Sequence, residues 1–383
     1  MSEGHALLSA SSAARWLNCP PSARLAAKAP DTTSAYAAEG SLAHALAELK
    51  LRKHFVEPMG ARTYNARLKR LQADPAWQDE MQRYTDGYLD YVKDLAMQYP
   101  QRPLVAVEQR LDYSDWVRDG FGTGDCVLLG GGVLQIVDLK YGKGVSVSAE
   151  RNPQMMLYAL GAIGRYRAFY GIDTVRLTIY QPRLDNISRW ETTPDELIRW
   201  GEEVARPAAD LAYQGAGELR AGDWCRFCPV RARCRARCES YFALEPLSAK
   251  APDLLADAEI GDALRRAQGL KGWVADLEEY ALSAALAGRD IPGWKAVEGR
   301  STRQWDDQDA AFAALAAAGV DEALLYERRP ITLAAAEKLL GKAAFAEIAS
   351  NYVLRPPGKP TLVPETDPRA PIHRDAAQLF ATN

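Results

Sequence analysis

The feature that most constrains the fold is a change in hydrophobic period near residue 104. Before it, apolar side chains recur every three or four positions in several segments, which predicts helices. These segments are residues 9–16, 39–56 and 76–98. Beyond it, apolar and polar residues alternate in three short segments, and the last two flank Gly130-Gly131-Gly132, which predicts a meander of strands. These strands are residues 104–111, 125–129 and 133–140.

The next segment has the apolar spacing of a helix, and the one after it has the alternating apolar residues of a strand. Asn152 and Pro153 supply an N-cap and a first-turn proline for a helix that runs to about Tyr170. The sequence TVRLTIYQPR, which begins at Thr174, predicts a further strand. This order of elements favours an α/β fold in which helices flank a mixed central sheet. Residues 252–349 predict a mainly helical C-terminal region, which a proline-rich extended arm follows.

Composition narrows the functional classes. The 47 Lys and Arg residues against 50 Asp and Glu residues give a net charge of −3, so any nucleic-acid surface must be local. The sequence contains no G-x-x-x-x-G-K-[ST] phosphate loop, which argues against an ATPase motor. We expect a soluble cytoplasmic protein without membrane contact, because no window approaches about 18 uninterrupted apolar residues.

The strand LQIVDLK carries a carboxylate and an amine two residues apart. The period of two places Asp138 and Lys140 on one face of this strand. Asp125 starts the neighbouring strand, and Glu108 lies on the strand before that. Clustered carboxylates repel one another unless a cation compensates them, so we expect Mg²⁺ or Mn²⁺ here, with phosphodiester hydrolysis as the chemistry. The same spacing also fits an exposed ion pair without a catalytic role.

Three more side chains are candidate site residues when they are considered together with this cluster. Gln154 and Tyr158 are four residues apart and share one face of the predicted helix, where an amide and a phenol suit contact with nucleic acid. The alternative for Tyr158 is ordinary packing in the core. His44, one of four histidines, lies in the second helical segment.

Five short segments occur in one order along the chain. They are GSLAH, VEQRL, GTGD, IVDLKYGKG and QMMLY, between Gly40 and Tyr158. Together they resemble the PD-(D/E)xK nuclease superfamily, and most closely its RecB-like and AddB-like branch. The resemblance covers residues 9 to about 240 and implies a restriction-endonuclease-like sheet.

The resemblance also implies roles for individual residues. The metal ligands it implies are His44, Asp125, Asp138 and the Leu139 carbonyl. Lys140 would be catalytic, and Gln154 and Tyr158 would position DNA. Glu108 matches a less regular acidic position of the branch.

Four of the six cysteines are close together in the sequence. Cys225, Cys228 and Cys234 supply three thiolates, and the two-residue gap lets the first pair reach one metal centre. The fourth ligand is either Cys238 or the remote Cys19. With Cys238 the segment would form a compact zinc site, which suits a zinc-binding adaptor.

The resemblance favours Cys19. Nucleases of the AddB type hold a [4Fe-4S] cluster with one cysteine before the nuclease core and three after it. The corresponding residues are Cys19, Cys225, Cys228 and Cys234. Cys238 and Cys126 would then be free thiols, with Cys126 in the core of a strand. A cluster that joins Cys19 to Cys225 closes a loop of about two hundred residues and so restricts the unfolded chain.

Arginines surround the same cysteines. They are Arg226, Arg231, Arg233, Arg235 and Arg237. Such a group suits a phosphate backbone, or it forms a solvated charged surface around a metal knuckle.

Together these features predict a Mg²⁺- or Mn²⁺-dependent deoxyribonuclease, specifically an exonuclease that acts on single-stranded DNA or duplex ends. We expect a nuclease domain with an iron–sulfur cluster over residues 1–245 and a helical domain over residues 246–383. The C-terminal third, which includes GWKAVEGR and PPGKPTLVPETDPR, resembles an uncharacterised phage and prophage nuclease family, which implies DNA recombination or processing. A recombinase, a helicase or a single-strand-binding protein would then be a partner. The alternative function is a non-catalytic iron–sulfur scaffold subunit that binds DNA.

Overall fold

The computed structural model describes most of the chain. The described residues are 6–29, 35–242, 257–267, 269–297, 306–318, 321, 325–326, 332–349 and 352–353. Internal contacts divide the chain into two units, Met1–Ser283 and Ala284–Asn383. The expected domain boundary at residues 245–246 and the proline-rich arm lie outside the described residues. In the described ranges, every helix is too short or too polar to cross a membrane.

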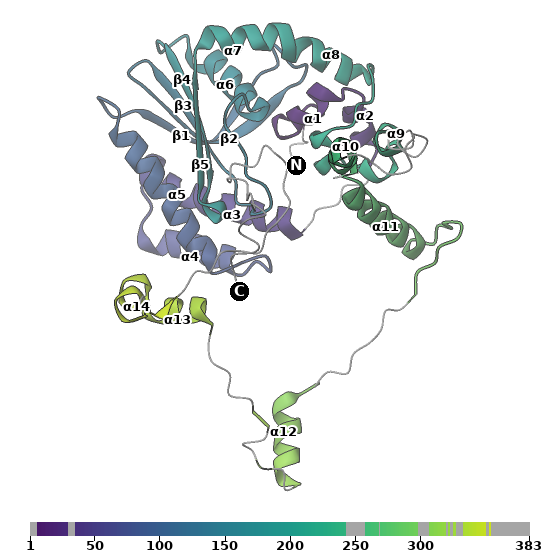
Figure 1. Cartoon of the computed structure of the whole chain (residues 1–383). Helices are drawn as coiled ribbons and strands as arrows, with labels where there is room; N and C mark the ends of the chain where they lie inside the picture. Colours follow the sequence, from purple (N-terminus) through teal and green to yellow (C-terminus); the bar gives the residue numbers. More distant parts are fainter. Residues whose placement is uncertain are drawn as a thin grey trace, which may run out of the picture. The chain divides into compact units, whose positions relative to one another are not determined.

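A mixed five-stranded sheet forms the centre of the first unit (Figure 1). The strands are β1 (Leu104–Asp112), β2 (Phe121–Gly130), β3 (Val133–Leu139), β4 (Thr174–Gln181) and β5 (Asn186–Thr192). They lie in chain order, with β3 and β4 parallel and all other neighbours antiparallel. The mixed sheet and the β1–β2–β3 meander are as predicted, whereas the sequence pattern does not predict β5.

Two glycines make the turn between β2 and β3. Gly131 and Gly132 have φ values of 53° and 79°, in the left-handed region. Two-residue hairpins with positive φ at both positions match the twist of the strands that they join. A side chain at Gly132 would also collide with Asp173, because a Cβ there would lie 2.5 Å from its Oδ2. This tight turn fixes the register that brings the acidic residues of β2 and β3 together.

Helices cover both faces of the sheet (Figure 1). Helices α3 (Ala35–Leu51) and α5 (Glu80–Met97) cover one face, and α6 (Pro153–Tyr166) covers the other. As predicted, Asn152 caps α6, since its side chain accepts hydrogen bonds from two backbone N–H groups of the first turn.

The remaining elements are shorter or peripheral. The other helices that begin in the first unit are α1 (Ala13–Asn18), α2 (Ser22–Ala27), α4 (Ala61–Gln72), α7 (Pro194–Trp200), α8 (Arg206–Gln214), α9 (Arg235–Phe242), α10 (Asp257–Ala267) and α11 (Leu270–Leu286). Short helical turns are η1 (Ala10–Ser12), η2 (Arg52–Val56), η3 (Pro182–Leu184), η4 (Gly201–Ala205), η5 (Asp223–Phe227) and η6 (Arg231–Arg233). The second unit contains α12 (Gln308–Ala317), α13 (Leu333–Leu340) and α14 (Lys342–Ala349), which agrees with its predicted helical character.

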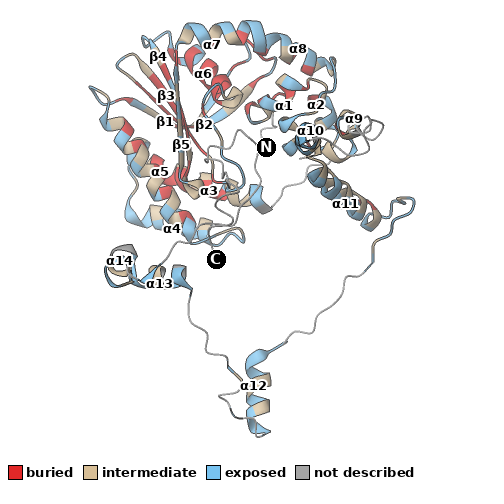
Figure 2. Ribbon diagram, in the orientation of Figure 1, coloured by how far each residue is buried: buried red, intermediate tan, exposed pale blue. Residues whose placement is uncertain are grey.

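The sheet separates two apolar layers (Figure 2). Val127 and Ile136 pack in the layer under α6, whereas their chain neighbours Cys126 and Val137 pack in the layer under α3 and α5. This is the alternation that a strand dictates. Because both faces are covered, polar side chains on the central strands lie in a medium of low dielectric, where charges interact strongly.

Candidate functional site

Three carboxylates lie side by side on three adjacent strands. Cys126 of β2 is paired with a valine on β1 and with a valine on β3. One position along, Asp125 therefore lies between Glu108 of β1 and Asp138 of β3. The hairpin register thus assembles the acidic residues that the sequence pattern predicts to be neighbours.

The backbone of Glu108 is strained. Its φ is 50°, a left-handed conformation that residues other than glycine rarely adopt. Val107 lies in the layer under α3 and α5, whereas Leu111 lies in the layer under α6. The two would share one face of a regular strand, so β1 changes face between them. Strain of this kind concentrates at functional sites, which singles out Glu108.

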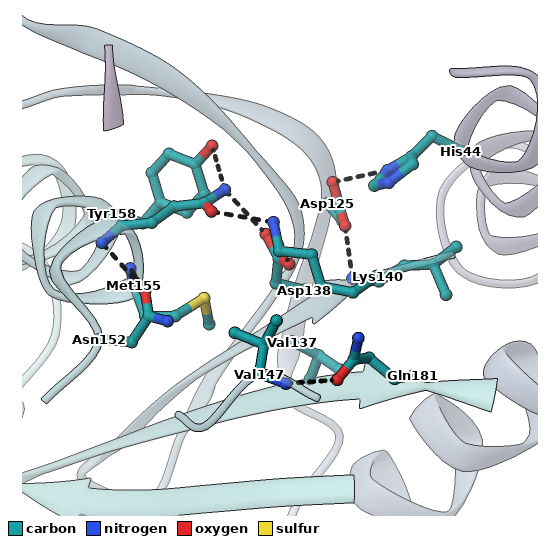
Figure 3. A network of polar contacts seen from close by, with 12 residues as sticks. His44, Asp125, Val137, Asp138, Lys140, Val147, Asn152, Met155, Tyr158 and Gln181 are labelled. Carbon is teal, nitrogen blue, oxygen red and sulfur yellow. Dashed lines mark hydrogen bonds and ion pairs between the residues drawn. The ribbon is translucent and has the colours of Figure 1, made fainter. Parts of the chain in front are cut away.

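His44 of α3 points at the middle carboxylate (Figure 3). Its Nδ1 lies 3.2 Å from Asp125 Oδ1, and the Leu139 backbone N–H donates to Asp125 Oδ2 at 2.6 Å. One ligand atom each from His44, Glu108 and Asp125 lies within 4.8 Å of the other two. Among the described residues this is the one group of three His, Cys, Asp or Glu side chains that is so close.

Charges in this group shift one another's protonation. Burial, reinforced by the charges of Asp125 and Glu48, raises the pKa of Glu108 to about 7. Burial acts to lower the pKa of His44, but Asp125 outweighs it and raises the pKa to about 9. Burial acts to raise the pKa of Asp125, but His44 and the Leu139 N–H hold it below its ordinary value. A positive charge close to Glu108 and Asp125 therefore stabilises their ionised forms.

Asp138 and Lys140 form the other half of the site, where β3 ends (Figure 3). Lys140 Nζ lies 2.9 Å from Asp138 Oδ2 and donates to Gln154 Oε1 at 2.9 Å. Gln154 Nε2 donates to Asp138 Oδ1 at 3.3 Å and to the Tyr158 hydroxyl at 3.2 Å. Gln154 of α6 thus contacts both members of the ion pair.

The Asp138–Lys140 pair is shielded from solvent. The Asp138 side chain is 3% exposed and that of Lys140 28%, so the alternative of an exposed surface pair does not apply. Burial raises the pKa of Asp138 although Lys140 opposes this, and Asp138 raises the pKa of Lys140 against the effect of burial. Tyr158 is buried in the layer under α6, so the core packing considered for it is confirmed, while its hydroxyl reaches the polar group.

Gly122 allows this close approach of α6. A Cβ at Gly122 would lie 2.7 Å from Tyr158 Cε1. Gly122 lies inside β2, which begins at Phe121 and not at Asp125 as predicted. Glycine is depleted in strands, so the pattern places the strand start too late; here glycine marks a close contact instead.

Comparison with known proteins gives a family without an assigned function. Residues 5–370 match a family described as "Protein of unknown function (DUF2800)". The chain belongs to the DUF2800 family. A solved structure described as "Crystal structure of SSO0001" shares 13% identity with this DUF2800 chain, with a TM-score of 0.23. The match covers 50% of the DUF2800 chain and 95% of the other.

The donor set in the DUF2800 chain fits a hard divalent cation. An imidazole nitrogen and carboxylate oxygens from two strands converge at His44, Glu108 and Asp125. Oxygen-rich sites with few nitrogen donors suit Mg²⁺ and Mn²⁺. A bound cation would also offset the repulsion from Asp125, which adds to the larger effect of burial in raising the pKa of Glu108. Asp138, a predicted ligand outside this group of three, pairs with Lys140 and accepts a hydrogen bond from Gln154.

The cysteines of the DUF2800 chain form a second group, remote in sequence from the first. Cys19, Cys225, Cys228 and Cys234 line one pocket, and Cys238 is not part of its lining. The backbone N–H of Arg220 donates to Cys19 Sγ at 3.5 Å, which ties the N-terminal segment to the chain that follows α8. In the described residues no three cysteine sulfurs lie within 4.8 Å of one another.

Three of the arginines near these cysteines make contacts within the protein. Arg231 and Arg237 both pair with Asp276 of α11, and Arg233 lies over the ring of Tyr280. These contacts dock α11 against the cysteine segment. They reduce the charge available for a phosphate backbone, which weakens that expectation for this segment.

Sequence reasoning does not single out Glu48 and Arg52. Glu48 follows His44 by one turn on α3, and Arg52, the first residue of η2, follows one turn later; Arg52 Nε donates to Glu48 Oε1 at 2.6 Å. Both influence the pKa of Glu108. The spacing of four residues from His44 is the signal that points to them.

Proposed function

We propose that this chain is a divalent-metal-dependent DNA nuclease. The observation that carries the proposal is the row of Glu108, Asp125 and Asp138 on three adjacent strands, in which His44 contacts Asp125 and Lys140 contacts Asp138. Buried acidic residues repel one another unless a cation joins them. A half-buried lysine beside such a site suits an anionic substrate, and a cation and a positively charged side chain both stabilise the charge that develops during phosphodiester hydrolysis.

In this proposal His44, Glu108 and Asp125 hold the metal ion. Bound Mg²⁺ or Mn²⁺ would supply Lewis-acid polarisation of a phosphodiester oxygen and would lower the pKa of a bound water. The Leu139 backbone N–H and His44 orient the two oxygens of Asp125. Ligation by Asp138 and by the Leu139 carbonyl, which the sequence resemblance implies, stays a prediction.

Lys140 supplies positive charge to the phosphate. Asp138 keeps its amine protonated, because the carboxylate raises the pKa of Lys140 against the effect of burial. Gln154 contacts both groups and so fixes the direction in which the ammonium points. A preorganised donor of this kind stabilises charge that develops on phosphate oxygens during hydrolysis.

We also propose that the four cysteines hold a [4Fe-4S] cluster. The support is that Cys19 lines the same pocket as Cys225, Cys228 and Cys234, whereas Cys238 does not. Burial raises the pKa of Cys225 and Cys228 and so favours their neutral thiols. The positive charge of an iron–sulfur core would offset this effect and favour the thiolates that bind iron. Iron and acid-labile sulfide in anaerobically purified protein test this assignment, and a zinc content without iron would contradict it.

Digestion of end-labelled DNA tests the nuclease proposal. Anaerobically purified protein should degrade single-stranded or duplex DNA with Mg²⁺ or Mn²⁺ and not with chelator. Lys140→Ala should lower the rate by about 10²–10³-fold, as the loss of a preorganised donor does. Lys143→Ala, an exposed lysine three residues further on, is the matched control and should retain activity.

The outcome also decides between the candidate functions. Metal-dependent DNA binding without hydrolysis by the wild type would favour the non-catalytic scaffold. Circular single-stranded DNA, which has no ends, should resist an exonuclease and would be cut by an endonuclease. The phage or prophage recombination setting, with a recombinase, helicase or single-strand-binding partner, remains an expectation from the resemblance alone.

A further inference from the structure

A second polar pocket lies beside the candidate metal site, between α3 and α4. Its volume is about 410 Å³, and three guanidinium groups line it, together with two carboxylates and apolar side chains of both helices. The charged residues are Arg52, Arg67, Arg70, Glu48 and Glu57. The sequence analysis assigns no role to any of them.

The charges in this pocket are unevenly compensated. Arg52 is paired with Glu48, since Nε donates to Oε1 at 2.6 Å. Arg67 lies at the limit of pairing with Glu57, with 4.0 Å between Nη2 and Oε1. Arg70 has no acidic partner among the described residues. Arg67 and Arg70 therefore offer most of the free positive charge.

The helix that carries Arg67 and Arg70 is itself strongly basic. Helix α4 has the sequence ARTYNARLKRLQ, which contains four cationic residues and no acidic one. All four cations are exposed. Arg67, Arg70 and Leu71 have the spacing of one helical face and line the pocket, whereas Arg62 and Lys69 do not. Leu68 and Leu71 pack α4 against the apolar cluster of α3 and α5. This packing holds the helix that carries Arg67 and Arg70 in place.

The pocket shares a wall with the metal site. Arg52 Nη2 donates to the carbonyl oxygen of Val107 at 3.4 Å, and Val107 precedes Glu108 in β1. Ala45 and Glu48 of the pocket lie on α3 next to His44 and one turn beyond it. The pocket and the metal site are therefore neighbours, as two contacts with one nucleic-acid strand require.

We propose that Arg67 and Arg70 bind a backbone phosphate of the DNA strand whose neighbouring phosphodiester lies at the metal site. This inference rests on the proposed nuclease function and names a second contact with the same substrate. Guanidinium groups bind phosphate oxygens in paired geometry. The apolar side chains of Ala45, Leu49 and Leu71 offer a surface for the sugar or base that accompanies the phosphate. Bound in this way, the strand is held at the reacting bond and at one neighbouring phosphate.

Salt-dependent DNA binding tests the proposal independently of cleavage. The probe is a fluorescein-labelled single-stranded oligonucleotide, and binding is followed by fluorescence anisotropy in Ca²⁺ over a range of salt concentrations. R67A/R70A should weaken binding at least about tenfold. The slope of log K against log salt should fall by about 0.7 for each phosphate contact that is lost from a single strand.

Two further variants make the result specific. R62A/K69A removes equal charge from the same helix outside the pocket and should change affinity less than about twofold. R67K/R70K keeps the charge but not the paired geometry, so it should restore the salt slope and only part of the affinity. Equal losses in R62A/K69A and R67A/R70A, or wild-type binding by R67A/R70A, would overturn the proposal.

Failure of this inference and failure of the nuclease proposal give different results. If Lys140→Ala abolishes cleavage while R67A/R70A binds DNA normally, the nuclease proposal stands and the phosphate site is wrong. If the wild type never cleaves DNA but R67A/R70A loses binding with a reduced salt slope, the pocket binds DNA and the nuclease proposal is wrong.

Discussion

At the scale of single residues, Gln154 links the two halves of the site. Its amide oxygen accepts from Lys140, and its amide nitrogen donates to Asp138 and to the Tyr158 hydroxyl. These contacts predict that Gln154 affects hydrolysis through Lys140 and Asp138. We therefore regard Gln154 as a positioning residue, which differs from the direct DNA contact that the resemblance implies.

Gln154→Leu should lower kcat for DNA hydrolysis by about tenfold or more and leave KM nearly unchanged, because misdirected charge affects the transition state most. Tyr158→Phe keeps the ring in the core and removes one contact of Gln154, so it is the matched control and should stay within about threefold. Steady-state kinetics on end-labelled DNA measure both variants. Equal effects on KM and kcat, or a larger effect of Tyr158→Phe, would contradict the positioning role.

Glu108→Gln should stabilise the metal-free protein and weaken metal binding. The change removes one of two opposed, largely buried carboxylates, which should raise the free energy of unfolding by about 1–2 kcal/mol without metal. Thermal unfolding with and without Mn²⁺ measures both effects. Glu57→Gln, an exposed carboxylate outside the group of Glu108, Asp125 and Asp138, is the control and should change neither. A lower melting temperature of metal-free Glu108→Gln would contradict this account.

Sequence patterns predict part of the site and miss the rest for physical reasons. The period of two correctly places Asp138 and Lys140 together, and i,i+4 spacing correctly places Gln154 near Tyr158. The strained backbone of Glu108 has no sequence signal, because its φ is set by tertiary packing. The approach of His44 to Asp125 spans 81 residues of chain and follows from the family resemblance, not from local pattern.

At the scale of elements, strongly patterned segments are predictable and polar ones are not. The alternating apolar segments predict β1 to β4, and the Asn152 cap predicts the start of α6. Strand β5 is missed because its sequence, NISRWET, is largely polar, as suits a strand at the edge of the sheet. Helix α4 is missed because few of its residues are apolar and its packing depends on Leu68 and Leu71.

Asp276 should control how α11 docks against the cysteine segment. It pairs with Arg231 and with Arg237, which is largely buried. Asp276→Asn leaves these guanidiniums without a carboxylate and should cost about 2–3 kcal/mol of local stability. Hydrogen exchange should then increase in residues 231–242 and 270–283. Glu279→Gln, at the exposed edge of the same network, is the control and should have little effect.

The same contact should depend on pH in a defined direction. Burial opposes ionisation of Asp276, but Arg237 and Arg231 lower its pKa below the ordinary value of 3.8. A carboxyl group with a lowered folded pKa contributes stability above its unfolded value and loses it as pH falls through the folded value. Protection of residues 270–283 from exchange should therefore persist above pH 3.8 and decline below it. Loss of protection near neutral pH would contradict this assignment.

At the scale of the whole molecule, the cysteine pocket joins distant parts of the chain. Cys19 precedes the sheet and contacts Arg220, which is 201 residues away and follows α8. A cluster at this point would close the chain around the sheet and reduce the entropy of the unfolded state. The cysteine spacing leaves the fourth ligand of the proposed cluster open; Cys19 lines the pocket of Cys225, Cys228 and Cys234, whereas Cys238 does not.

Cys19→Ser should therefore lose iron and lower the melting temperature by several degrees. Cys238→Ser is the matched control, because Cys238 lies outside the lining of the pocket, and it should retain both. Iron content and thermal unfolding under anaerobic conditions measure the two effects. Loss of iron in Cys238→Ser with full iron in Cys19→Ser would reverse the ligand assignment.

The most direct test of the central claim is the Mn²⁺ dependence of DNA hydrolysis by the wild type, His44→Ala and Asp125→Asn. The wild type should show saturable activation by Mn²⁺. His44→Ala should need at least about tenfold more Mn²⁺ for half-maximal rate, and Asp125→Asn should be essentially inactive while it remains folded. Hydrolysis that persists in chelator, or the same Mn²⁺ dependence in all three proteins, would show that the carboxylate row is not the metal centre of a nuclease.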